Sequence, residues 1–404
     1  MNIATNTGLR VVVLGYVVRG PLGGLAWHHL QYVTGLRALG HDVYFVEDSD
    51  DYPSCYDPAR GTVDADPSYG LRFAADAFAR LGLGERWCYY DAHAARWAGP
   101  LAPRAREVCE SAELLLNLSG VNPLRPWTER TAARAFVDTD PAFTQIRHLT
   151  DPSARARAAA HNSFFTFAEN VARADCLVPP DGFAWQPTRQ PVHLDAWPVT
   201  PGPRDGSWTT VMQWDSYRAR EYEGRRYGMK SDSFAAFVDL PARAGRVFEI
   251  ALGSESAPRA HLRAKGWRLL DPLEVTRDPW SYQEFIRGSK GEWSVAKHGY
   301  VASRSGWFSE RSAAYLASGR PVVTQETGFS DWLETGRGLV AFDTPDGALA
   351  GMADIAGDYP RHCRAARALA EEFFDARKVL SSLIVRAHDG GAAGGGLQGS
   401  VGGD

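Results

Sequence analysis

The chain lacks the features that mark several large classes of protein. Its longest early apolar run, residues 11–14, is too short for a signal peptide or a membrane-spanning helix. Its five cysteines are odd in number and widely spread, and no CxxC pair occurs, which argues against a zinc site or a disulfide framework. A net charge of −4 offers no electrostatic case for nucleic acid. We therefore expect a cytoplasmic protein with no membrane span and no nucleic-acid partner, and the oligomeric state is left open.

The length and composition are those of an ordinary globular protein with more than one core. At 404 residues the chain is long for a single domain, and 44% of its residues are hydrophobic. Residues 179–208 are rich in proline, as expected of a crossing between domains. The sequence predicts a first domain over residues 1–190 and a second over residues 191–386, which ends in a helical region at 360–386. The glycine-rich tail, residues 387–404, is expected to be disordered.

The first fifty residues have the pattern of a strand, a helix and a second strand. Residues 10–16 form an apolar run, residues 25–39 carry apolar side chains at helical spacing, and residues 43–46 are apolar again. Helices and strands continue to alternate along the chain, and residues 163–172 are predicted as a helix. Parallel strands joined by helices imply an α/β fold whose sheets are covered on both faces.

A glycine-rich turn before the first helix offers one candidate site. Gly23 and Gly24 let the backbone approach a ligand, and a helix start attracts anions. His28 and His29 follow, where a neutral imidazole can act as a base, and one of the two is expected to face a ligand while the other packs. A dinucleotide-binding fold would have GxGxxG directly after the strand, so the GPLGG pattern keeps a nicotinamide dehydrogenase only as an alternative.

Two acidic clusters are candidates for contacts with an acceptor. Asp48 and Asp51 follow the second predicted strand, where they orient a base, bind hydroxyl groups or are simply solvated. Asp138 and Asp140 form a DxD tripeptide, which in one class of sugar transferase holds a divalent metal. Because Asp140 precedes Pro141, a turn or an acceptor contact is favoured over a metal, and Asp140 is the second candidate for a base.

The sharper signal is the helix start within the sequence SRSGWFSER. Ser305, Gly306 and Ser309, a good N-cap, offer hydroxyl and N–H groups to a diphosphate. Arg311 lies in the first helical turn, where the helix dipole disfavours a cation, so it is expected to serve an anion or a carboxylate partner. Lys230, after the basic turn GRRYGMK, is expected to reach the same phosphates. An ordinary capped helix and a solvated lysine are the alternatives.

Over roughly residues 9–385 the chain resembles GT-B glycosyltransferases, through the motifs GPLGGLAWHH, EDSDDYPSCYDP, GMKSDSF and SERSAAYLASGRPVV. Its C-terminal half is similar to that of the large retaining family four, and the whole chain to uncharacterised bacterial glycosyltransferases. The resemblance implies two Rossmann-like, doubly wound domains that face a central cleft. It also implies a nucleotide-sugar donor, bound mainly by the second domain, and no required metal or other cofactor.

The same resemblance assigns roles to particular residues. It implies that Gly23 and Gly24 lie near the donor phosphates and that Lys230 contacts the diphosphate. Ser309, Glu310 and Arg311 would line the nucleotide and phosphate site, and Thr327, Gly328 and Phe329 would approach the sugar. Family four has two glutamates eight positions apart, and here Gly306 and Ala314 stand in their places. Glu310 or Glu326 would therefore have to replace the ribose-binding carboxylate.

Together these patterns predict a metal-independent transferase of hexosyl or deoxyhexosyl groups from a nucleotide sugar, with UDP or TDP as the nucleotide. The acceptor would be a small molecule or a glycan. The catalytic candidates are His28, His29 and Asp140, and the candidate acceptor contacts are Asp48, Asp51 and Asp138. A nucleotide-sugar epimerase, an NAD-dependent dehydrogenase and a non-catalytic nucleotide-sugar-binding module are the alternatives.

Overall fold

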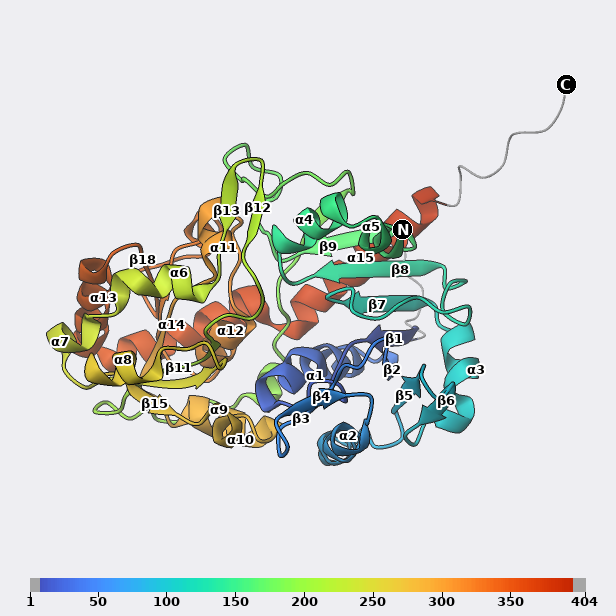
Figure 1. Ribbon diagram of the computed structural model, residues 1–404, viewed down its shortest axis with the longest axis horizontal. Helices are drawn as coiled ribbons and strands as arrows, with labels where there is room; N and C mark the ends of the chain where they lie inside the picture. Colours follow the sequence, from blue (N-terminus) through green and yellow to red (C-terminus); the bar gives the residue numbers. More distant parts are fainter. Residues whose placement is uncertain (1–7, 395–404) are drawn as a thin grey trace, which may run out of the picture.

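The computed structural model describes residues 8–394 and shows two lobes side by side, each built on its own β-sheet (Figure 1). The first sheet has the strand order β10-β9-β8-β7-β1-β2-β5-β6, and all neighbouring strands are parallel except β5 and β6. Its strands are β1 (Arg10–Leu14), β2 (Asp42–Asp48), β5 (Trp87–Asp91), β6 (Arg96–Ala98), β7 (Leu114–Leu118), β8 (Ala133–Asp138), β9 (Ser163–Thr166) and β10 (Trp185–Pro187).

The second sheet is wholly parallel, with the order β15-β14-β11-β16-β17-β18. Its strands are β11 (Trp208–Gln213), β14 (Phe248–Gly253), β15 (Arg268–Leu270), β16 (Gly291–Ser294), β17 (Val322–Gln325) and β18 (Leu339–Phe342). Two antiparallel hairpins stand apart from the sheets: β3 (Cys55–Asp57) with β4 (Thr62–Asp64), and β12 (Arg220–Tyr222) with β13 (Arg225–Tyr227).

The α-helices of the first lobe are α1 (Gly23–Ala38), α2 (Ser68–Arg80), α3 (Ala105–Glu110), α4 (Phe143–Thr150) and α5 (Pro152–Ala159). Those of the second lobe and the chain end are α6 (Lys230–Phe234), α7 (Leu240–Ala244), α8 (Arg259–Ala264), α9 (Pro272–Val275), α10 (Pro279–Arg287), α11 (His298–Ser303), α12 (Glu310–Ala317), α13 (Pro345–Gly357), α14 (Tyr359–Leu369) and α15 (Ala376–Gly394). None of the helices within residues 8–394 combines the length and apolarity that a membrane span requires.

Both faces of the first sheet are buried, as the side chains of β1 show. Val11 and Val13 belong to the core that contains α1 and α15, whereas Val12 and Leu14 belong to a separate core closed by α3. Successive side chains of a strand point to opposite faces, so a strand buried on both sides reads as a continuous apolar run. The predicted α/β fold with covered parallel sheets is therefore confirmed.

The chain crosses between the lobes twice, and the two crossings lie together. The first crossing joins β10 to β11, and the second is the approach to α15, which runs back along the first lobe (Figure 1). The Val192 N–H donates to Phe374 O and the Ala376 N–H donates to Val192 O, so the crossings are hydrogen-bonded to each other. Helix α15 packs on α1 and β8 and continues through residues 387–394, which the sequence assigns to the tail. Residues 395–404 lie outside the described part of the chain.

One predicted element has the wrong type. Residues 163–172 are predicted as a helix, but Ser163–Thr166 form β9, which pairs with β8 and β10. The sequence Ser-Phe-Phe-Thr is rich in the aromatic and β-branched residues that suit a strand, and all four residues are buried at this position in the sheet. A short apolar run has no periodicity that separates the two structures.

Candidate active site between the lobes

Helix α12 begins at the face of the second lobe that is turned toward α1. Ser309 caps it, since its Oγ accepts a hydrogen bond from the Arg311 N–H at 3.2 Å. Arg311 is only 7% exposed, and its Nε donates to the buried Glu292 carboxylate while Nη1 donates to Val211 O at 2.9 Å. Burial opposes its charge, but Glu292 raises the pKa of Arg311. The predicted carboxylate partner thus exists, and it fixes a cation at the start of the helix.

Lys230, the first residue of α6, adds a second cation to this region. Burial, together with the nearby Arg311 guanidinium, lowers the pKa of Lys230 well below its ordinary value. The charges of Glu310 and Lys297 also affect the pKa of Lys230, so these side chains lie within electrostatic range of it. Within residues 8–394 the Lys230 ammonium has no hydrogen-bond or ion-pair partner. Its half-buried side chain keeps its hydrogen-bonding capacity free, and in the protonated form it can bind an anion.

The glycine-rich start of α1 is packed rather than open. A Cβ on Gly23 would lie 2.1 Å from Asp278 O, and a Cβ on Gly24 would lie 2.9 Å from the Tyr282 ring. The Gly23 N–H already donates to Thr276 O at 2.7 Å. These two glycines therefore allow α1 to approach the second lobe at α10, and one N–H that the sequence assigns to phosphates is bonded to protein.

The two adjacent histidines of α1 have different surroundings. His29 is fully buried, with Nδ1 against Leu25 O at 2.9 Å and Nε2 accepting from the Tyr16 N–H at 3.2 Å. Burial lowers its pKa well below the ordinary value. His28 lies beside Glu310 at the interlobe pocket and makes no hydrogen bond within the described residues. Burial lowers the pKa of His28, although Glu310 opposes that effect. Because His28 lines the pocket and His29 does not, His28 is the one of the pair that presents a neutral ring to the interface.

Asp140 links the lobes instead of facing an empty space. Its carboxylate accepts hydrogen bonds from Lys297 Nζ at 2.9 Å and from the hydroxyls of Tyr217 and Tyr300. Burial alone would raise its pKa, but Lys297 and the two hydroxyls hold the pKa of Asp140 below its ordinary value. A carboxylate with three donors and a lowered pKa is a poor general base, and this geometry favours a role in holding the second lobe.

The other predicted acidic contacts are also used by the protein. Asp138 is buried and accepts from Gln145 Nε2, Thr166 Oγ1 and the Asp140 N–H, and burial raises its pKa. Asp48 and Asp51 both bind Arg125, Asp48 through two nitrogens at 2.9 and 3.1 Å. The DxD tripeptide and the acidic loop are therefore built into local networks.

Two glycine-containing loops, one predicted to contact the diphosphate and the other the sugar, pack against the first lobe. Asn170 donates through its amide to Gly328 O at 2.8 Å, and its N–H donates to Ser305 O at 3.1 Å. A Cβ on Gly306 would lie 2.8 Å from the Asn170 side chain. Thr327 and Phe329 are 2% and 1% exposed, and the Thr327 hydroxyl donates to Trp307 O. Glu310 and Arg311 thus lie at the interface with α1, whereas the loops at Gly306 and Gly328 are in contact with Asn170 of the first lobe.

Several residues of this interface were not singled out from the sequence. Glu292 holds Arg311, and Lys297, which lies just beyond the carboxyl end of β16, binds Asp140. The position of Lys297 was a usable signal, because parallel α/β sheets place ligands at the carboxyl ends of their strands. Glu292 gave no such signal, since a single charged residue in a short strand is not recognisable as a partner. Across residues 8–394 no group of three or more His, Cys, Asp or Glu side chains is arranged to hold a metal ion.

Comparison of the structure with solved proteins defines the class of fold. No protein-family model matches the sequence, and no curated protein matches it. An alpha-glucosyltransferase in complex with UDP and a 13-mer DNA is 11% identical, with 94% of this chain and 99% of that chain covered and a TM-score of 0.55. The glycosyltransferase AviGT4, involved in avilamycin A biosynthesis, is 12% identical, with 95% and 98% covered and a TM-score of 0.52.

The catalytic domain of starch synthase IV from Arabidopsis thaliana, bound to ADP and acarbose, is 11% identical, with 96% and 100% covered and a TM-score of 0.53. These matches extend over both lobes. The chain therefore has the GT-B fold of glycosyltransferases, two Rossmann-like domains about a central cleft, as the sequence resemblance predicted.

The prediction that nucleic acid is excluded as a partner is wrong. Structures of similar fold include an alpha-glucosyltransferase in complex with DNA that contains an abasic site and with 13-mer DNA. Net charge averages over the whole surface, so a value of −4 does not decide what a cleft between two lobes can hold.

Proposed function

We propose that this protein is a glycosyltransferase that moves a sugar from a nucleoside-diphosphate sugar to an acceptor. The observation that carries the proposal is the convergence of Lys230 and Arg311 on the start of α12, opposite His28 of the first lobe. Glycosyltransferases of similar fold were solved with UDP or ADP, which supports a nucleotide sugar as donor.

The chemistry asks the protein to stabilise a leaving diphosphate. As the bond between the sugar and the diphosphate breaks, negative charge accumulates on the leaving group. Arg311, held by Glu292, and Lys230, which has no other partner in the described chain, would oppose that charge. The N–H groups and dipole of α12 would add to their effect. Preorganised charges of this kind are usually the largest catalytic contribution, because they need no rearrangement during the reaction.

His28 is the general base that this geometry supports best if the reaction inverts the sugar carbon. A buried, neutral imidazole without a protein hydrogen bond can accept a proton from an acceptor hydroxyl. His29 is the poorer candidate, since both of its ring nitrogens already contact backbone groups. If the reaction retains configuration, His28 would position the acceptor instead.

Calorimetric titration of the protein with UDP, TDP, GDP and ADP tests the donor site. We expect one nucleoside diphosphate to bind, and its glucose conjugate to be turned over in the presence of a suitable acceptor. The absence of binding by all four nucleotides would contradict the proposal. The anomeric configuration of the product, read by NMR, assigns an inverting or a retaining reaction.

The acceptor panel should contain small aromatic molecules, oligosaccharides and DNA, the last because an alpha-glucosyltransferase of similar fold was solved with DNA. Nucleotide binding without transfer to any acceptor would favour a non-catalytic binding module. A changed sugar in the absence of acceptor would indicate an epimerase.

For a dehydrogenase, the carboxylates at the end of β2 would need to bind ribose. Glu47, however, accepts the N–H groups of Val17, Val18 and Arg19, and Asp48 holds Arg125.

A further inference from the structure

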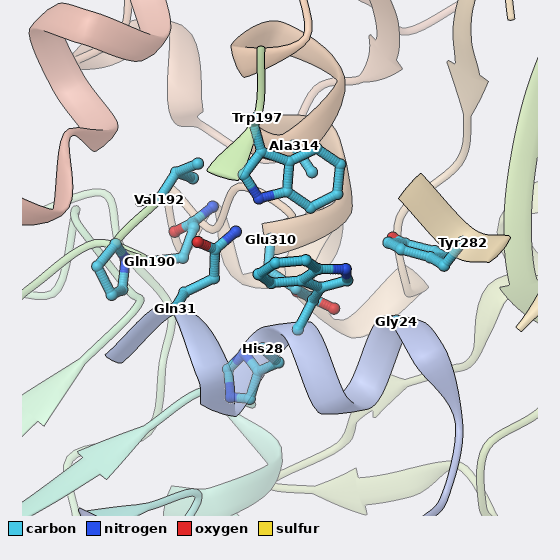
Figure 2. Close-up of a pocket in the computed structure, with 11 residues that line it drawn as sticks. Gly24, His28, Gln31, Gln190, Val192, Trp197, Tyr282, Glu310 and Ala314 are labelled. Carbon is cyan, nitrogen blue, oxygen red and sulfur yellow. The ribbon is translucent and has the colours of Figure 1, made fainter. Parts of the chain in front are cut away.

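A small pocket lies between the lobes, at the end of the interface where the chain crosses. Its walls come from α1, the first crossing, α10 and α12, and Figure 2 shows their side chains around a common space. About 320 Å³ is free of protein atoms in this region, a volume that includes open solvent, and the enclosed part is narrow, with room for about one water-sized group such as a hydroxyl. The pocket adjoins the candidate donor site because Glu310 and Ala314, one turn apart on α12, both line it.

Aromatic rings form much of the pocket wall. Trp27 and Trp197 lie 5.3 Å apart between ring centroids, and Tyr282 stands 6.5 Å from Trp197. Trp27 is fixed in place because its Nε1 donates to Pro279 O at 2.7 Å. Apolar rings with polar edges suit sugar rings, whose C–H faces pack on aromatic surfaces while their hydroxyls seek hydrogen bonds.

The pocket also holds polar groups whose hydrogen bonds are unfilled. Trp197 is fully buried and its Nε1 has no partner among the described residues, a costly arrangement for a donor unless a ligand or solvent satisfies it. Gln31 uses its Oε1 to accept from the His193 N–H, which leaves its amide N–H groups for the pocket. Figure 2 shows the indole nitrogen of Trp197 on the side of its ring that faces Gln31 and Gln190.

The pocket also contains free hydrogen-bond acceptors. Gln190 donates through Nε2 to Phe308 O at 2.8 Å, so its carbonyl oxygen remains free. Glu310 makes no hydrogen bond or ion pair within residues 8–394. Donors and acceptors placed around one narrow space suit a hydroxyl group, which both donates and accepts.

The charge of the pocket limits the ligand further. No lysine or arginine lines it, and Glu310 is its acidic residue. A carboxylate placed here would face Glu310 at short range, with no lysine or arginine in the pocket wall to bind it, and partly buried like charges repel strongly. An uncharged ring edge with hydroxyls meets no such penalty.

From these observations we propose that the pocket binds the hydroxyl-bearing edge of a neutral sugar ring and discriminates against acidic sugars. The assignment rests on the proposed glycosyltransferase function and specifies its substrate class. The ring belongs either to the donor sugar or to a sugar on the acceptor, and both sources offer the same hydroxyl chemistry.

The first test removes the unpartnered indole N–H by Trp197→Phe and measures binding of UDP and UDP-glucose by calorimetry, or of whichever diphosphate and glucose conjugate the wild type binds. Trp87→Phe is the matched control, since Trp87 is also buried, also has an unpartnered Nε1, and lies on β5 outside the pocket. We expect Trp197→Phe to weaken binding of the sugar conjugate about fivefold, which is the value of one hydrogen bond. The affinity for the diphosphate should not change. Trp87→Phe should change neither.

A second arm identifies the source of the ring. If Trp197→Phe leaves UDP-glucose unaffected but weakens binding of methyl glucoside to the UDP-saturated protein, the pocket holds the acceptor sugar. If neither ligand responds, the pocket holds solvent only and the proposal is overturned. Failure of the wild type to bind any diphosphate would instead contradict the proposed function, so the two failures are distinguishable.

A third arm needs no variant at Trp197 and therefore remains informative if that variant does not fold. Wild-type protein should bind UDP-glucose at least about tenfold more tightly than UDP-glucuronate, which carries a carboxylate on the same ring, given one close like-charge contact. In Glu310→Gln the ratio should fall toward one. For an acceptor sugar, the same comparison uses methyl glucoside and methyl glucuronide with UDP present. Equal affinity for the neutral and acidic sugars in the wild type, in both pairs, would overturn the proposal.

Discussion

The starts of α1 and α12 look alike in the sequence, but the structure uses them differently. Each follows a glycine-containing loop and each was predicted to receive phosphates. At α1 the glycines bring the helix against α10, where a Cβ on Gly23 would meet Asp278 O at 2.1 Å. At α12 the start is capped by its own Ser309 and flanked by Arg311 and Lys230.

The difference shows that glycine before a helix has two separate causes. A missing Cβ permits close approach, and the approaching group is either a ligand or another part of the chain. What separates the two cases is charge: basic residues gather at α12, whereas the α1 start has no acidic or basic residue in its first turn. Substitutions at and around the two helix starts test this division between a packing helix start and a binding helix start.

The largest effect is expected from Arg311→Ala. It should lower the free energy of unfolding by about 3–5 kcal/mol, because Glu292 is left buried without its partner. Nucleoside diphosphate affinity should fall at least about tenfold, the equivalent of 1.4 kcal/mol. Denaturant unfolding and calorimetry measure the two quantities. Arg268→Ala serves as the control, since the Arg268 side chain is 55% exposed where it pairs with Glu249, and its loss should cost less than about 1 kcal/mol.

The double variant Arg311→Met with Glu292→Met separates stability from binding. Two apolar side chains of similar volume should restore much of the unfolding free energy, because no buried charge is left unpaired. Nucleotide binding should stay weak. Recovery of binding in the double variant would show that Arg311 has only a structural role. The start of α12, like that of α1, would then serve packing and not anion binding.

Gly23→Ala tests the packing assignment of α1. The added methyl group clashes with backbone, so the lobes must shift, at a cost of about 1–3 kcal/mol of unfolding free energy. Diphosphate affinity of the folded protein should change less than about twofold, well under the 1.4 kcal/mol that a tenfold change represents. Gly357→Ala, at a position with open space around it, should be neutral or slightly stabilising. Lost nucleotide binding with unchanged stability in Gly23→Ala would make α1 a phosphate site and break the comparison.

Asp140→Asn tests the link between the lobes. Loss of charge weakens the hydrogen bonds from Lys297, Tyr217 and Tyr300, at an expected cost of about 1–3 kcal/mol. The pKa of Asp140 is lowered in the folded protein, so its contribution is complete above the ordinary carboxyl pKa and is lost as pH falls through the lower folded value. The difference in unfolding free energy between wild type and variant should therefore shrink in acid. A fall in kcat of about a hundredfold at unchanged stability would instead restore Asp140 as a base.

Much of the fold follows from local sequence, whereas the site depends on distant pairings. The strand at Arg10–Leu14 and the helix that follows it were predictable from apolar spacing and turn residues. Other contacts arise only when segments far apart in the sequence meet. Examples are the ion pair of Arg311 with Glu292 and the hydrogen bond from Asn170 to Gly328 O. The choice between His28 and His29 was also hidden, because adjacent residues on a helix differ by which face they present.

Lys230 gives a smaller, pH-dependent effect. Its pKa is lowered well below the ordinary value by burial and by Arg311, so the side chain loses its proton at a lower pH than a solvated lysine does. Diphosphate affinity should therefore decrease as pH rises through that folded pKa, by severalfold at most because Arg311 remains charged. Lys230→Arg should flatten the profile, since arginine stays protonated. An identical pH profile in wild type and variant would remove Lys230 from the site.

The smallest effect is expected from removal of divalent metals. The resemblance implies no required metal, and the DxD carboxylates have other partners: Asp138 accepts from Gln145 and Thr166, and Asp140 accepts from Lys297. If the two cations beside α12 neutralise the leaving diphosphate, a metal ion is redundant, and transfer in excess EDTA should proceed at the untreated rate. Complete loss of transfer in EDTA, restored by Mn²⁺, would mean that the lobes open far enough to free Asp138 and Asp140. In that case α12 would not be the principal anion site.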